Sequence, residues 1–230
     1  MQTVATESNR YGITVRRATL ADAAFLARID QIAASVPFER SLWDDLLEPL
    51  GVSPHTFVEA MFTLNASNWG RTEEFIVLEK DGQPVAACVV FEPPQVQEDR
   101  RPLRLEKLTD IATHLSWSDS MTEEFQQHYE VFWGSRNTPF LAPQAPVLIE
   151  SVGVVPEARG LGLGKRLMQE AFAEARQRGH DTIGIMVIHG NDIARSLYES
   201  SGFKPYITYH ANYFDYGFPG VTKYRASLKS

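Results

Sequence analysis

The feature that most constrains this chain is a set of three glycines at alternate positions, Gly160, Gly162 and Gly164. They separate residues 147–154, which alternate as a strand does, from residues 163–178, which carry apolar side chains at helical spacing. Glycines let main-chain N–H groups approach a ligand closely, and the first turn of a helix has unpaired N–H donors and a partial positive charge. A strand that turns into a helix through these residues is therefore suited to binding phosphate.

Two familiar phosphate-binding loops do not fit these letters. The dinucleotide fingerprint G-x-G-x-x-G would need glycine at Lys165 or at Leu167, depending on the register. A P-loop ending at Gly164 and Lys165 would need glycine at Arg159 and Ser or Thr at Arg166. Taken alone, the glycines also fit a turn that only permits close packing. However, Lys165 and Arg166 lie at the helix end that the helix dipole makes unfavourable for cations, which points to a bound polyphosphate.

The rest of the chain alternates between strand-type and helical patterns. Asp81 and Gly82, which tolerate positive φ, separate two β-type runs and predict an antiparallel hairpin. Pro49, Gly51 and Pro54 are expected to separate two short helices, residues 42–47 and 56–64, because they break any continuous helix. Residues 93–146 are too many for an unstructured connection and carry helical patterns, so we expect a helical insertion there. The predicted strands are residues 13–17, 75–80, 84–91, 147–154, 182–188, 203–209 and 222–228, and the predicted helices are residues 20–34, 42–47, 56–64, 163–178 and 193–201.

Two motifs in the last third of the chain resemble those of the GNAT superfamily of N-acetyltransferases. The first is Arg or Gln followed by x-x-G-x-G or x-x-G-x-A after a strand, and residues 159–164 match it. The second, N-x-x-A-x-x-L-Y-x-x-x-G-F, matches residues 191–203. Both motifs stand in the expected order and in the expected strand and helix contexts. The resemblance covers residues 147–209 well and residues 13–92 loosely.

This resemblance implies an α/β fold, α+β in some schemes, that forms a single domain over residues 1–230. The central sheet is expected to be mixed and mostly antiparallel, flanked by helices, with a parallel pair of strands splayed at the cofactor site. The helical insertion at residues 93–146 would lie between the third and fourth strands, and residues 147–209 would form the acetyl-CoA-binding core. The insertion departs from the minimal family pattern.

The implied activity is direct transfer of an acetyl group from acetyl-CoA, as cosubstrate, to a primary amine of a small molecule or a protein, without a metal. By the same resemblance, the main chain of Val152, Gly153 and Val154 would bond the pantetheine arm, with one amide acting as oxyanion donor. Asn191 would also bond the arm, and its alternative role is a helix N-cap. The pyrophosphate would be held by Arg159, Gly160, Leu161, Gly162, Leu163 and Gly164, with Lys165 beside them.

Tyr198 occupies the family's position for the general acid that protonates the departing thiolate; a half-buried structural tyrosine is the alternative. Glu150 has the strand parity of Val152 and Val154, so we expect it to face the acyl site as the base that deprotonates the amine, directly or through water. A glutamate on a strand is also a common partner for a surface cation. His189 is the competing base, because its ordinary pKa is better suited to the task.

The composition argues against nucleic acid and membranes as partners. The formal net charge of −7 gives no support for binding nucleic acid, which needs Lys and Arg to neutralise phosphates. No run of apolar residues reaches the roughly 18 that a membrane helix needs, and the polar start lacks a signal core, so we expect no membrane association and a cytoplasmic location. The single cysteine, Cys88, lies in an apolar run and is expected to be a core residue rather than a nucleophile.

Other functions remain open from the sequence. The chain could be a module that binds or senses acyl-CoA without turnover, or an acyltransferase that uses a hydroxyl acceptor or a longer acyl chain. A homodimer is possible, as is frequent in the family. The late aromatic residues are expected either to pack in the core or an interface, or to line an acceptor pocket; they are Tyr206, Tyr209, Tyr213, Phe214, Tyr216 and Phe218. Four further aromatics lie in regions that the family uses for the acceptor groove, namely Phe38, Trp43, Trp117 and Trp133.

Overall fold

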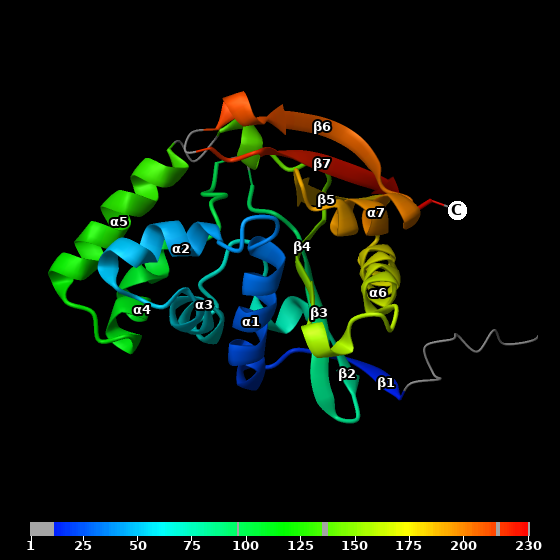
Figure 1. The fold of residues 1–230 in the computed structure, drawn as a ribbon, viewed down its shortest axis with the longest axis horizontal. Helices are drawn as coiled ribbons and strands as arrows, with labels where there is room; N and C mark the ends of the chain where they lie inside the picture. Colours follow the sequence, from blue (N-terminus) through cyan, green and yellow to red (C-terminus); the bar gives the residue numbers. More distant parts are fainter. Residues whose placement is uncertain (1–11, 96, 135–137, 215–216, 230) are drawn as a thin grey trace, which may run out of the picture.

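A seven-stranded sheet runs through the molecule in the order β1-β2-β3-β4-β5-β7-β6 (Figure 1). The computed structural model describes residues 12–95, 97–134, 138–214 and 217–229. Neighbouring strands are antiparallel except β4 and β5, which run parallel, so the expected mixed and mostly antiparallel sheet is confirmed. The strands are β1 (Ile13–Arg17), β2 (Phe75–Lys80), β3 (Gln83–Phe91), β4 (Leu148–Val154), β5 (Thr182–Ile188), β6 (Lys204–His210) and β7 (Gly220–Ser227).

Helices cover both faces of the sheet around β3 and β4. Helix α1 (Ala23–Ala34) lies on one face beside α3 (Pro54–Thr63), and α6 (Leu163–Gln177) lies on the other, next to α7 (Asp192–Ser200) (Figure 1). Because both faces are covered, every residue of segments 75–78 and 86–91 is buried, which explains why these strands are apolar runs without alternation. On α6 the buried side chains recur at helical spacing and form one stripe: Leu163, Leu167, Met168, Ala171 and Ala175.

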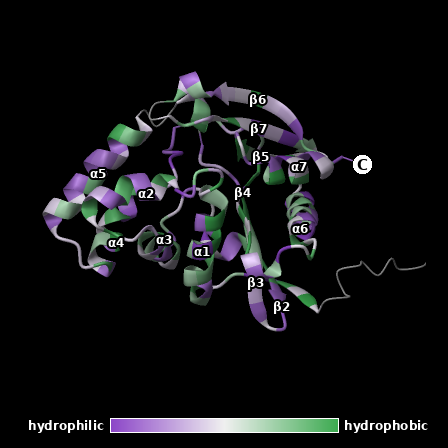
Figure 2. Cartoon of the chain, viewed as in Figure 1, coloured by the Kyte–Doolittle hydropathy of each residue, from purple (hydrophilic) through white to green (hydrophobic). Residues whose placement is uncertain are grey.

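The insertion between β3 and β4 is helical, as expected. It contains α4 (Leu108–His114) and α5 (Asp119–Trp133), which lie beside α2 (Leu42–Leu47) and α3 (Figure 1). Helix α5 carries both hydrophilic and hydrophobic bands (Figure 2), and its hydrophobic side chains join an aromatic cluster. In that cluster Phe57 stacks on Trp117 with ring centroids 5.8 Å apart and meets Phe125 at 5.0 Å. The insertion is therefore bound to the helices on the α1 face.

Two local predictions have clear outcomes. The hairpin at Asp81 and Gly82 is confirmed, because both residues have positive φ, 52° and 77°, between antiparallel β2 and β3. The prediction that Pro49, Gly51 and Pro54 separate two short helices is also confirmed: α2 ends at Leu47, Gly51 has a φ of 66°, and α3 begins at Pro54 after the N-cap Ser53. The first helical position does not need the N–H that proline lacks, and its fixed φ suits a helix start.

Candidate active site

Strands β4 and β5 separate along their length. Within these two strands the register pairs only Leu148 with Gly184, and Gly184 N donates to the carbonyl of Val147 at 2.9 Å. Beyond that point the edge of β4 that faces β5 has no ladder, although its other edge is paired with β3 as far as Val154. The expected splayed parallel pair is confirmed. On that edge, main-chain donors and acceptors of residues 149–154 are thus left available to a ligand that lies along β4 as an added strand.

A bulge interrupts β4 at Ser151. Val89 pairs with Glu150 and Ala87 with Gly153, so Cys88 alone faces the two residues between them. Ser151 has φ of 49°, in the left-handed region that only a bulge or turn usually requires. The parity argument that grouped Glu150 with Val152 and Val154 is therefore wrong, because the side-chain alternation does not run unbroken through a bulge.

The turn before α6 has the geometry of an anion site. Gly160 and Gly162 have positive φ, 81° and 73°, and an added Cβ at either would meet no heavy atom within 4 Å. Gly162 is the N-cap of α6 and supplies no side-chain acceptor, so the N–H groups of the first helical turn point out of the helix without an intrahelical partner. Gly164 instead packs against α7, since a Cβ there would approach Leu197 at 3.0 Å. The residues fit a diphosphate.

The cationic residues of this turn divide between two roles. Arg159 and Lys165 line the cavity that opens in front of the turn. Arg166 forms an ion pair with Glu170, one turn along α6, at 2.6 Å. A local acid therefore offsets the unfavourable position of Arg166 in the helix dipole, while Arg159 and Lys165 stay candidate partners for phosphate. Leu161 packs against the core, and only its main chain is suited to a phosphate contact.

A cavity of ≈ 1360 Å³ joins this turn to the splayed strands and continues toward the insertion. It exceeds the roughly 300–1,000 Å³ typical of a site for one small ligand. Its wall contains the bulged end of β4, both glycines of positive φ, and residues of α1, α2 and α5. Of the predicted cofactor residues, Val152, Gly153, Val154, Arg159, Gly160, Gly162, Leu163, Gly164, Lys165 and Asn191 all line it. The cavity has room for two substrates.

Tyr198 lies in the wall of this cavity, on α7, and is buried with 6% of its surface exposed. Helix α7 begins at the N-cap Asn191, whose side chain accepts a hydrogen bond from Ala194 N at 3.1 Å, so the alternative role of Asn191 as a cap is confirmed. Burial raises the pKa of the Tyr198 phenol, and the nearby carboxylate of Glu150 raises it further. The phenol therefore keeps its proton at neutral pH, as a proton donor must.

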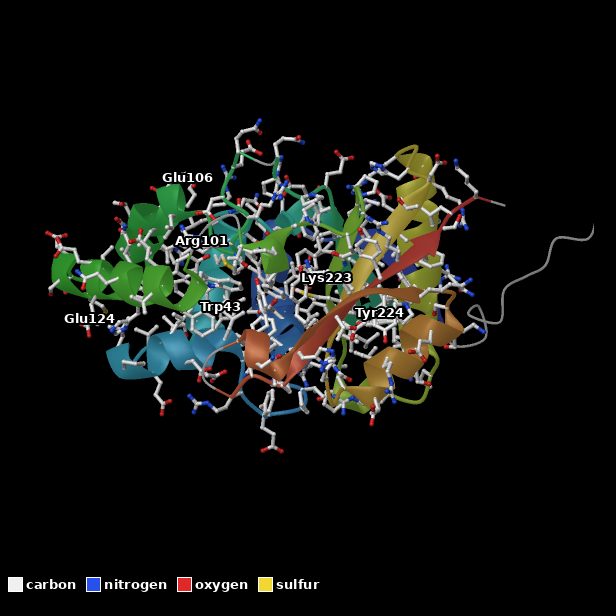
Figure 3. The ribbon with its side chains drawn as sticks, turned by 90° about the horizontal axis from the view of Figure 1, so that it is seen from above. Trp43, Arg101, Glu106, Glu124, Lys223 and Tyr224 are labelled. Carbon is white, nitrogen blue, oxygen red and sulfur yellow. The ribbon has the colours of Figure 1, made fainter. Side chains whose placement is uncertain are left out.

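Glu150 lines the same cavity, half-buried on β4. Burial raises its pKa to about 8, while the ammonium of Lys223 lowers the pKa and the carboxylate of Asp30 raises it. Lys223 stands on β7 near the centre of the molecule (Figure 3), 4% exposed, and burial lowers its own pKa to about 8. Its ammonium donates to the carbonyl oxygens of Phe140 and, at 2.7 Å, Ala142. A carboxyl group of this kind can take up a proton close to neutral pH.

Asp30, near the end of α1, is a cavity residue that the sequence analysis missed. Its Oδ1 accepts a hydrogen bond from Ser151 Oγ at 2.8 Å, which connects α1 to the bulge of β4. Burial raises the pKa of the Asp30 carboxyl, and the donors of Ser151 and Trp43 oppose this rise. The sequence gives no local signal for the residue, because 120 positions separate it from Glu150 and only the folded sheet brings the two together.

The other candidates take different places. His189 is not part of the cavity wall, and its ring nitrogens lie 3.2 Å from the carbonyl of Pro219 and 3.0 Å from Thr222 Oγ1. Cys88 is a buried core residue, as expected, and burial raises its pKa to about 12. Trp117 is in the aromatic cluster of the insertion, and Tyr216 lies outside the described residues. The remaining predicted aromatics that line the cavity are Phe38, Trp43, Trp133, Tyr213, Phe214 and Phe218.

The described residues form neither a metal-binding cluster nor a membrane-spanning helix. No group of three or more His, Cys, Asp or Glu side chains in that part of the chain is placed to hold a metal ion. No helix among the same residues has the length and apolar character needed to cross a membrane.

Solved structures that share this fold include acetyltransferases. The N-acetyltransferase of Staphylococcus aureus Mu50 aligns over 93% of this chain and 100% of its own, with a TM-score of 0.60 and 15% identity. The acetyltransferase yncA of Salmonella typhimurium, solved with its cofactor acetyl-CoA, aligns over 95% of both chains with a TM-score of 0.52 and 18% identity. At these identities, the alignments show a shared fold and nothing further.

Sequence comparison gives the family. A profile of the acetyltransferase (GNAT) family matches residues 39–203, and the chain therefore belongs to that family. A mycothiol acetyltransferase of Thermobispora bispora is 30% identical over 134 residues, 49% of this chain and 44% of that protein. A mycothiol acetyltransferase of Beutenbergia cavernae is 45% identical over 62 residues, 27% of this chain and 20% of that protein. The chain spans less than half the length of either relative.

Proposed function

We propose that this protein transfers an acetyl group directly from acetyl-CoA to a primary amine of a small molecule. The observation that carries the proposal is the meeting of Tyr198 and Glu150 in one cavity with the splayed edge of β4. A group that holds its proton and a group that titrates near neutral pH thus face the place where a strand-like ligand would end.

The roles of the residues follow from their positions. Amides of the turn at Gly160–Gly164 and the first turn of α6 bind the diphosphate, while the main chain of residues 152–154 aligns the pantetheine arm and one amide polarises the thioester carbonyl. Glu150 accepts a proton from the ammonium group, and the neutral nitrogen bonds to the carbonyl carbon. The carbon–sulfur bond breaks as Tyr198 donates its proton to the departing sulfur, and the second proton that the bonded nitrogen must lose returns to the Tyr198 oxygen.

Several expectations stay predictions under this proposal. They are the amine as acceptor, the cytoplasmic location, a homodimer, and one domain with residues 147–209 as the cofactor-binding core. A hydroxyl acceptor or a longer acyl chain would use the same main-chain donors. The raised pKa of Glu150 favours an amine, because an ammonium must lose a proton before it can attack and a hydroxyl does not carry that charge.

The test is release of coenzyme A thiol from acetyl-CoA in the presence of amines, with the N-acetyl product identified by mass spectrometry. Tyr198→Phe should lower kcat at least about tenfold while the Kd for acetyl-CoA changes little, because the ring stays and only the proton donor is lost. Unchanged turnover in Tyr198→Phe would remove the assigned acid. Tight binding of acetyl-CoA without product from any amine would instead favour a sensing module.

A further inference from the structure

The cavity continues past the reacting groups into a region whose walls are apolar. Here the lining comes from the end of α1, from α2, from the end of α5 and, between β6 and β7, from Tyr213, Phe214, Gly217 and Phe218. Val36, Phe38, Val131 and Tyr213 are exposed large apolar side chains, and all four line this region. Exposed apolar side chains that gather around one opening mark a binding surface.

Aromatic rings form much of that wall. Trp133 of α5 meets Trp69 and Phe132 edge-on, with centroids 5.9 Å and 5.6 Å apart. Between β6 and β7, Phe214 packs against Phe218 with ring centroids 4.8 Å apart. Such rings offer flat apolar faces, which favour a planar or bulky apolar body over a hydrated polar one.

Two acidic side chains lie close together in this part of the cavity. Asp30 and Glu150 both line the cavity and are near enough for the charge of Asp30 to raise the pKa of Glu150. The guanidinium of Arg40, at the rim, is already paired with Asp45 and Glu48. An incoming cation would offset the carboxylate charge, whereas an incoming anion would add like charge where water is scarce.

Two buried polar atoms of the cavity wall also lack a hydrogen-bond partner in the described part of the chain. Among the described residues, Asp30 Oδ2 and Trp133 Nε1 are buried without a hydrogen-bond partner, and both side chains belong to the cavity wall. Asp30 Oδ1 accepts a hydrogen bond from Ser151 and the indole of Trp43 also favours the charged carboxylate, so the carboxylate is fixed in position, while Oδ2 has no hydrogen bond to the described residues. Unpartnered buried polar groups are costly in a folded protein, and a ligand that supplies the missing bond removes that cost.

We propose that the acceptor is a primary ammonium attached to an apolar, aromatic body, and that Asp30 binds the ammonium beside Glu150. This inference rests on the proposed function, since it names the acceptor class of the same site. The ammonium lies between the two carboxylates, the ring lies against the aromatic wall, and Glu150 then removes the proton. Acceptors that carry a carboxylate next to the amine are rejected by Asp30.

Three amines separate these features: 2-phenylethylamine has the ammonium and the ring, phenylalanine adds a carboxylate, and ethanolamine lacks the ring. At saturating acetyl-CoA, we expect kcat/KM for 2-phenylethylamine to exceed that for either of the others by at least about 30-fold. Asp30→Asn should raise the KM for 2-phenylethylamine about tenfold or more, narrow the discrimination against phenylalanine and leave the Kd for acetyl-CoA unchanged. The matched control is Asp110→Asn on α4, a carboxylate outside the cavity that is 52% exposed and pairs with Lys107, and it should behave as wild type.

Calorimetric binding of the three amines to the coenzyme A complex separates this inference from the proposed function. Turnover of all three amines with similar kcat/KM, or an unaltered Asp30→Asn enzyme, would overturn the inference and leave amine acetylation standing. Selective binding of 2-phenylethylamine without any N-acetyl product would support the acceptor class and overturn the proposed reaction. Equal or absent binding of all three amines would overturn the inference.

Discussion

At the scale of single residues, the site depends on how its surroundings raise the pKa of Glu150. Glu150 has its pKa raised to about 8 because burial disfavours the charged carboxylate more than Lys223 stabilises it. The carboxylate, which is the form able to accept a proton, therefore gains population as pH rises through about 8. The dependence of rate on pH should show this directly.

We predict that kcat/KM rises with pH and levels off above about pH 8, as the carboxylate of Glu150 becomes fully populated. In Glu150→Gln the rate should fall by about 10²-fold or more and this inflection should disappear, leaving only the titration of the acceptor itself. A pH–rate profile with one acceptor checks both. An inflection that survives in Glu150→Gln would assign the base to another group.

Lys223 should tune that inflection without taking part in the reaction. Replacing it by Met removes the cation that lowers the pKa of Glu150, so the inflection in Lys223→Met should move to higher pH. Lys229→Met is the control, since Lys229 is 69% exposed and pairs with Asp181 far from the cavity. If the profile of Lys223→Met coincides with that of wild type, the electrostatic link between β7 and Glu150 is absent.

At the scale of elements, the proposed cofactor site depends on the N-terminus of α6. The glycines at the two ends of this helix allow a matched comparison. Gly162, before α6, and Gly179, after it, both have positive φ, 73° and 82°, and an added Cβ meets no heavy atom within 4 Å at either position. Alanine at either position should therefore cost a similar amount of stability, about 1–2 kcal/mol, from left-handed strain alone.

Only Gly162→Ala should also weaken acetyl-CoA binding. Its Cβ enters the open space in front of the helix N-terminus, where we place the diphosphate, and we expect the Kd to rise at least about tenfold. Calorimetric titration of both variants, alongside their denaturation midpoints, makes the comparison. Equal loss of affinity in Gly162→Ala and Gly179→Ala would mean that strain, and not the site, sets the effect.

At the scale of the whole molecule, the insertion is a packed part of the structure because its segment around Leu103 bonds to the chain after α3, where Arg104 N donates to the carbonyl of Ala66 at 2.8 Å. A buried phenol of α5 bonds to the same segment of the insertion. Tyr129 of α5 is fully buried, and its hydroxyl accepts a hydrogen bond from Leu103 N at 2.9 Å. Tyr129→Phe should lower the free energy of unfolding by about 1–3 kcal/mol, since a buried N–H loses its partner. Tyr206→Phe, on a side chain that is 52% exposed, should leave the free energy of unfolding within about 0.5 kcal/mol of wild type.

The whole fold also shows where sequence reasoning holds and where it ends. Periodicity and the two motifs predicted every strand of the sheet to within a few residues, because those signals are local. The bulge at Ser151 has no such signal, since its positive φ is imposed by pairing with β3 and by the bond to Asp30. In the sequence, Asp30 and Lys223 are polar residues of a helical and a strand pattern, and neither belongs to a motif. Their burial beside Glu150 follows only from how α1, β4 and β7 are assembled.

The most direct measurement is a structure of the protein with bound acetyl-CoA. We expect diphosphate oxygens to lie within about 3 Å of main-chain nitrogens in the segment from Gly160 to Lys165. We also expect the pantetheine arm to follow residues 152–154 and the sulfur to lie within reach of the Tyr198 hydroxyl. A diphosphate bound away from the glycine turn, or a thioester that ends away from Tyr198 and Glu150, would contradict these expectations.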